Sequence, residues 1–79
     1  MNIRVLYFGV IAEITKRTEE MIEVVDTTSI HQLEKIVQEQ YPALLSTSYS
    51  IAINQQIVNQ DRMLTSENEV ALLPPFSGG

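Results

Sequence analysis

Residues 29–42 read Ser-Ile-His-Gln-Leu-Glu-Lys-Ile-Val-Gln-Glu-Gln-Tyr-Pro, and this stretch predicts the one long helix of the chain. Ser29 and Gln32 form a capping-box pair, in which the hydroxyl accepts from the third helical N–H and the amide side chain reaches back to the N-cap. Pro42 predicts an end near Tyr41, because the residue before a proline avoids helical dihedral angles. One face is apolar and needs a second layer to cover it, at Ile30, Leu33, Ile36, Val37 and Tyr41.

Segments typical of β-strands lie on both sides of this helix. They are rich in β-branched and aromatic residues or alternate in hydropathy, and they cover residues 3–8, 21–25, 49–53, 57–58 and 69–73. A short helix over residues 10–15 and a charged connector over residues 16–20 separate the first two strands. Asn54 to Gln56 is expected to be a turn. The first strand should lie antiparallel to the second and parallel to the last, with the first and last strands at the centre of the sheet.

One long helix packed on a mixed sheet is a two-layer α+β architecture, and this order of elements is that of the ubiquitin-like β-grasp. We expect residues 1–73 to form a single β-grasp domain and residues 74–79 to form a flexible C-terminal tail. No repeat, linker or second domain is predicted.

Composition excludes several classes of function. The chain has 79 residues, ten acidic and five basic, for a formal net charge of −5. Such a chain should be repelled by nucleic acid and should suit a partner with a basic surface. The absence of cysteine excludes disulfides and thiolate chemistry and is compatible with a reducing cytoplasmic setting. No signal peptide or membrane span is predicted. We therefore expect a cytoplasmic protein with neither nucleic-acid nor membrane partners.

Residues that commonly carry catalysis are sparse. His31 is the only histidine, and we expect it to be an ordinary surface residue of the long helix, so that no metal site is predicted. No glycine-rich loop is present to hold a nucleotide phosphate, so the chain should not bind ATP by itself. The carboxylates before the long helix are expected to form a solvated edge, at Glu19, Glu20 and Glu23.

This elimination directs attention to the C-terminal segment Pro74-Pro75-Phe76-Ser77-Gly78-Gly79. The prolines lack backbone donors and favour an extended path, and six extended residues at about 3.3 Å each reach roughly 20 Å. Gly78 and Gly79 lack a Cβ, so a narrow channel in a partner could close around them. The Gly79 carboxylate is a poor electrophile until it is activated, and adenylation by a partner would supply a leaving group. The alternative is an ordinary frayed terminus.

Residues 69–79, Glu-Val-Ala-Leu-Leu-Pro-Pro-Phe-Ser-Gly-Gly, resemble the end of the small subunits of molybdopterin synthases, a family of ubiquitin-like sulfur carriers. The opening stretch 3–9, the tripeptide 12–14 and the strand end 52–55 resemble the same family. The resemblance spans the whole chain, and the terminal motif is fairly specific.

The resemblance implies a sulfur carrier that is no enzyme by itself and binds no cofactor stably. An E1-like adenylyltransferase would use ATP to adenylate Gly79, and sulfur from a persulfide-bearing protein would replace the AMP to leave a thiocarboxylate. The tail would then enter the large catalytic subunit, where two sulfurs convert cyclic pyranopterin monophosphate into molybdopterin. Similar enzymes are heterotetramers of two small and two large subunits. The residues expected to contact partners are Pro75, Phe76, Ser77 and Gly78.

Two turns depart from the family pattern. Ser66-Glu67-Asn68 stands where Asp-Gly-Asp is expected, which implies either a different turn type or a strained residue. Lys16 or Arg17 stands where a glycine often follows the first short helix. Other functions stay open on the same fold: a carrier for thiazole or another metabolite, a ubiquitin-like modifier joined to lysines, or a binding module whose Gly-Gly has no role.

Overall fold

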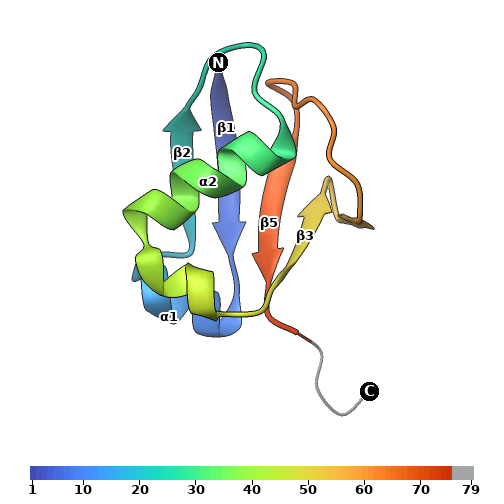
Figure 1. Cartoon of the computed structure of the whole chain (residues 1–79). Helices are drawn as coiled ribbons and strands as arrows, with labels where there is room; N and C mark the ends of the chain where they lie inside the picture. Colours follow the sequence, from blue (N-terminus) through green and yellow to red (C-terminus); the bar gives the residue numbers. More distant parts are fainter. Residues whose placement is uncertain (76–79) are drawn as a thin grey trace.

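The computed structural model describes residues 1–75, so Phe76, Ser77, Gly78 and Gly79 lie outside the described residues. Figure 1 shows α2 crossing one face of a mixed sheet, with the chain leaving the end of β5 toward the C-terminus. The elements in chain order are β1 (Asn2–Tyr7), α1 (Gly9–Thr15), β2 (Glu19–Glu23), α2 (Ile30–Gln40), the 3₁₀ helix η1 (Pro42–Ser46), β3 (Ser50–Ile53), β4 (Gln56–Val58) and β5 (Glu69–Leu73).

The five strands are ordered β2-β1-β5-β3-β4, with β1 and β5 parallel and the other neighbours antiparallel. The predicted α+β β-grasp architecture and the parallel pairing of the first and last strands are therefore confirmed. Alternate residues of each strand point into the layer beneath α2, as the two-residue period of a strand requires. The buried core gathers these side chains with the apolar face of the helix, including Ile3, Val5, Tyr7, Ile22, Leu33, Val37, Ile51, Ile53, Val70 and Leu72.

The start of α2 forms the predicted capping box. Ser29 Oγ accepts a hydrogen bond from the Gln32 N–H at 3.2 Å, and Gln32 Oε1 accepts from the Ser29 N–H at 2.8 Å. The loop before β5 closes over the same helix end, because Asp61 Oδ1 accepts from the His31 N–H at 3.0 Å. No helix within residues 1–75 has the length and apolar character needed to cross a membrane.

The second strand lies two residues earlier than the sequence predicted. β2 spans Glu19–Glu23, so the charged connector is shorter than expected, and Val24 and Val25 lie beyond the strand. The cause is the register with β1, in which Leu6 faces Glu19 and Val5 faces Glu20.

The prediction that Glu19, Glu20 and Glu23 form a solvated edge is wrong for Glu20. Its side chain is only 14% exposed, and Oε1 accepts hydrogen bonds from the hydroxyls of Tyr7 at 2.8 Å and Tyr41 at 3.0 Å. Arg17 NH1 lies 3.5 Å from the other carboxylate oxygen. Burial, followed by the hydrogen bond to Glu20, raises the pKa of Tyr7 well above its ordinary value. The carboxylate therefore joins β1, β2 and the end of α2, while Glu19 stays exposed as expected.

The Glu20→Ala variant tests this role. Removing the carboxylate leaves two tyrosine hydroxyls without their acceptor in a mostly buried site, so we expect the free energy of unfolding to fall by about 2 kcal/mol. Urea denaturation monitored by circular dichroism measures the change. The matched control is Glu19→Ala, which removes an exposed ion pair with Arg4 and should cost no more than about 0.5 kcal/mol. Equal losses in the two variants would contradict the assignment.

Candidate functional site

The sheet face turned away from α2 exposes large apolar side chains. Phe8 is 45% exposed at the end of β1, Ile57 is 50% exposed on β4, and Met21 is 59% exposed on β2. Isolated exposed apolar residues need no explanation, but a contiguous group marks a candidate interaction surface.

Part of this face is hollow because two small residues lie side by side in it. Ala52 of β3 is paired with Ala71 of β5, and larger side chains surround the pair. The resulting hollow has a volume of about 450 Å³. We call it the open-face groove and define it by its lining residues, Leu6, Phe8, Ala52, Gln55, Ile57, Glu69, Ala71 and Leu73.

A small ion-pair cluster forms part of the polar rim beside the groove. Arg4 Nε lies 2.9 Å from Glu19 Oε2, and Arg4 NH1 lies 3.4 Å from Glu69 Oε2. The hydrogen bond to Glu19 raises the pKa of the Arg4 guanidinium. Exposed pairs of this kind contribute little to stability, so their main effect is on the charge pattern that a partner meets.

The C-terminal segment leaves the sheet at one end of this groove. β5 ends at Leu73, which lines the groove, and the Phe8 N–H donates to the Leu72 carbonyl at 3.3 Å as the last bond of the parallel pairing. Pro74 has no N–H with which to continue the ladder. Gly9 allows this exit: its φ is 55°, and a Cβ there would lie 2.9 Å from Cγ of Pro74.

All of the predicted site residues belong to that departing segment. Pro75 is exposed directly beyond the sheet. Phe76, Ser77, Gly78 and Gly79 lie outside the described residues, so their roles stay predictions.

The open-face groove was not predicted from the sequence. Its signal was present in the alternation of β1, where Leu6 and Phe8 occupy the face opposite Val5 and Tyr7.

The turn between β3 and β4 borders the groove and was predicted as a turn. Asn54 and Gln55 have φ values of 50° and 71°, both in the left-handed region. Asn54 fastens the turn to the start of β5, because its N–H donates to the Glu69 carbonyl at 2.9 Å and its Oδ1 accepts from the Glu69 N–H at 2.8 Å.

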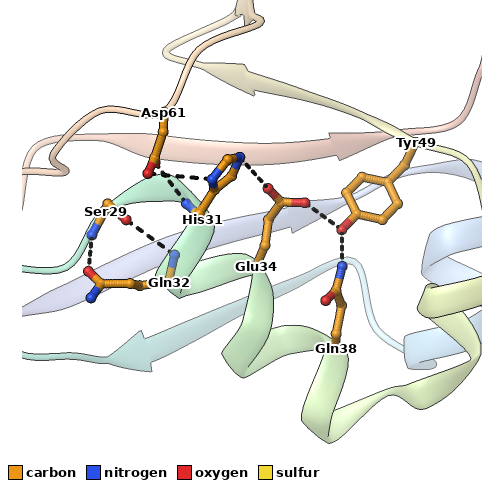
Figure 2. A network of polar contacts seen from close by, with 7 residues as sticks. All are labelled: Ser29, His31, Gln32, Glu34, Gln38, Tyr49 and Asp61. Atoms are coloured by element: carbon orange, nitrogen blue, oxygen red, sulfur yellow. Dashed lines mark hydrogen bonds and ion pairs between the residues drawn. The ribbon is translucent and has the colours of Figure 1, made fainter.

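A polar network lies along α2 on another side of the molecule (Figure 2). The Tyr49 hydroxyl donates to Glu34 Oε2 at 2.7 Å and accepts from Gln38 Nε2 at 2.8 Å. Burial first, and then the hydrogen bond to Glu34, raise the pKa of Tyr49 to about 12. The imidazole of His31 lies 3.5 Å from Asp61 and 3.9 Å from Glu34 and is 66% exposed, as expected for a surface helix residue.

This network fastens α2 to its neighbours. The hydrogen bond from the His31 backbone N–H lowers the pKa of the Asp61 carboxyl. Every buried side-chain polar atom of the described residues has a hydrogen-bond partner. Across residues 1–75, no three histidine or carboxylate side chains gather as a metal site would require.

The two turns that depart from the family pattern, at Lys16 and at residues 66–68, have different backbone conformations. Lys16 caps α1 with a left-handed φ of 61°, where glycine would be unstrained, and its N–H donates to the Ala12 carbonyl at 2.8 Å. The turn after Thr65 uses no left-handed residue: the Asn68 N–H donates to the Thr65 carbonyl, and Asn68 Oδ1 accepts from the Thr65 N–H. Of the two alternatives, a different turn type is the one observed.

Comparison with known proteins covers the segment beyond the described residues as well. The model of the ThiS family matches residues 5–79. The chain belongs to the ThiS family. A relative from Caenorhabditis elegans, named molybdopterin synthase sulfur carrier subunit, is 34% identical over 83 residues, with 100% of this chain and 99% of that protein covered. The predicted resemblance to the small subunits of molybdopterin synthases is thus confirmed.

Solved structures support the same fold for this ThiS-family chain. A chain from the solved protein–protein complex of subunits 1 and 2 of the molybdopterin-converting factor from Helicobacter pylori matches with a TM-score of 0.72 and 27% identity, over 100% of this chain and 100% of that chain. SAMP1 from Haloferax volcanii matches with a TM-score of 0.84 at 19% identity, also over 100% of both chains. The latter likeness concerns the fold alone.

The Gly9→Ala variant tests the packing at the exit. A side chain at this positive φ, with its Cβ against Pro74, should lower the free energy of unfolding by about 1–2 kcal/mol, measured by urea denaturation. Combining it with Pro74→Ala separates the two contributions, because the double variant keeps the backbone cost and loses the contact with the proline ring. A Gly9→Ala protein as stable as the parent would show that the contact is not tight.

Proposed function

We propose that this chain carries sulfur on its C-terminal Gly79 as the small subunit of a molybdopterin synthase. The observation that carries the proposal is the Gly78-Gly79 terminus of a chain that aligns end to end with sulfur carrier subunits. Such a carrier needs no active site of its own, and the described residues offer a docking face and an exit for the C-terminal segment.

The chemistry proceeds on the terminal carboxylate. On an E1-like adenylyltransferase, a carboxylate oxygen of Gly79 attacks the α-phosphate of ATP and pyrophosphate leaves. The outer sulfur of a protein persulfide then attacks the acyl carbon and AMP leaves. A thiol cleaves the resulting acyl disulfide and frees the thiocarboxylate. On the large subunit, the thiocarboxylate sulfur attacks a carbon of cyclic pyranopterin monophosphate and an oxygen substituent of that carbon leaves. Water then hydrolyses the resulting thioester, which leaves the sulfur on the pterin and frees the Gly79 carboxylate for another cycle.

The residues of this chain position the C-terminal carboxylate for these reaction steps. Pro74 and Pro75 start the segment without extending the sheet, and the glycines let a narrow channel close around the backbone. One end of the open-face groove, at Leu73, lies where the segment leaves the sheet, and the partner that receives the segment is proposed to cover the groove as well. The net charge of −5 suits basic partner surfaces. We place the assembly in the cytoplasm, as a heterotetramer with two large subunits.

Mass spectrometry tests the chemistry. Incubating the protein with the adenylyltransferase, ATP and a sulfur source should add the mass difference between sulfur and oxygen at the C-terminus. Deletion of Gly79 should abolish the gain. An unchanged mass in the parent protein counts heavily against the proposal, and recovery of the chain joined to lysines in cells would favour the modifier function instead.

The same assay examines the steric role of the glycines. Gly78→Phe should leave the melting temperature unchanged, because position 78 follows the last strand and the proline pair, yet it should block the mass gain. Ser77→Ala is the matched control and should retain most of the activity if the serine is only a spacer.

Filling the groove tests where the large subunit binds. Ala71→Met places a long side chain in the hollow, and we expect the Kd for the large subunit to rise by at least about tenfold, since a filled pocket loses its packing with the partner. Isothermal titration calorimetry measures the Kd. Ala43→Met makes the same change at an exposed position of η1 and should leave the Kd unaltered. Equal affinity of the two variants would place the contact elsewhere.

A further inference from the structure

Gln55 occupies a backbone conformation that suits glycine better. Ile53 pairs with Gln56, so Asn54 and Gln55 form a two-residue hairpin turn, and both have positive φ. Such a turn is of type I′, in which glycine is strongly preferred at the second position. Asparagine tolerates the left-handed region because its short side chain can hydrogen-bond locally, but glutamine lacks this compensation.

The turn also holds the base of the Gln55 side chain rigidly. Asn54 is bound to Glu69 through both its N–H and its Oδ1, at 2.9 and 2.8 Å. Gln55 is exposed and lines the open-face groove, where Glu69 is the other polar residue. Glu69 already contacts Arg4 at 3.4 Å. Gln55 thus presents an exposed amide from a fixed point beside an otherwise largely apolar surface.

The occupant of this groove follows from where the chain continues. Leu73 lines the groove, and six residues follow it to Gly79. Fully extended, they reach no farther than roughly 20 Å. A protein that receives Gly79 must therefore lie close to the Leu73 end of the groove. Gln55 lies at the opposite end, where Asn54 is bound to Glu69 at the start of β5. The inference therefore requires a partner that covers the groove along its whole length. In the proposed function that protein is the large subunit, and the present inference rests on that assignment.

We propose that Gln55 is a specificity-determining residue for the large subunit. Its side-chain amide hydrogen-bonds a main-chain peptide group of that subunit at the rim of the open-face groove. The amide offers both a donor and an acceptor, which matches a peptide group and fixes the orientation of the docked surface. Glycine would relieve the backbone but remove the amide, which accounts for glutamine at a position where the backbone favours glycine.

Three variants test the proposal. Gln55→Gly removes both strain and amide, so its melting temperature should be unchanged or up to about 5 °C higher. Its Kd for the large subunit should rise about five- to tenfold, as loss of one buried hydrogen bond predicts. Gln55→Ala removes the amide and keeps the strain. Its Kd should be raised as much as that of Gln55→Gly, and its melting temperature should be close to that of the parent. Lys16→Gly relieves a left-handed residue at the end of α1, outside the groove, and should leave the Kd within about twofold while affecting stability like Gln55→Gly.

The outcomes separate this inference from the proposed function. Failure of the parent protein to bind the large subunit would reject the proposed function itself. Another outcome is that the parent binds the large subunit and Ala71→Met weakens that binding while Gln55→Gly leaves it unchanged. This result would overturn the role of Gln55 alone. A Kd raised in Gln55→Gly but not in Gln55→Ala would assign the effect to turn flexibility and also overturn it. A melting temperature of Gln55→Gly several degrees below the parent would show that the backbone is not strained there.

Discussion

The parallel pairing of β1 with β5 is the constraint on which the rest of this structure depends. It joins the two ends of the sequence in one ladder, with Arg4 facing Glu69 and Tyr7 facing Leu72. A parallel ladder cannot be closed by a tight hairpin, so the intervening chain must cross over, and α2 lies within that crossover. Burying the apolar face of α2 against the sheet supplies the hydrophobic stabilisation that offsets closing so long a loop.

The same pairing decides what each face of the sheet can do. Toward α2, it gathers the large side chains of β1 and β5 into a closed core. Toward solvent, it brings Leu6 of β1 beside Ala71 of β5, whose other neighbour is Ala52 of β3. Large residues around two small ones leave the open-face groove. The end of the ladder also determines where the chain departs, because Pro74 cannot add a bond and packs on Gly9.

Polar side chains stabilise the outer parts of this frame. The Glu20 carboxylate holds the hydroxyls of Tyr7 and Tyr41, and the network along α2 holds Tyr49 and the loop at Asp61. Backbone strain is distributed differently, since left-handed non-glycine residues of the described chain occur at the end of α1 and in the turn beside the groove. A strained residue that also lines a candidate docking surface is consistent with a function that outweighs a small loss of stability.

Local signals in the sequence determined most of the elements by themselves. The capping box at Ser29, the break at Pro42 and the strand over residues 69–73 all follow from rules that act within a few residues. The role proposed for Gly79 rests on the resemblance of the terminal motif to a family of sulfur carriers. The register of β2, the partners of Glu20, the hollow at Ala52 and Ala71 and the contact between Gly9 and Pro74 were decided only in three dimensions. Each of these joins residues that are distant in the sequence, and a pattern of local preferences carries no information about which distant side chains meet.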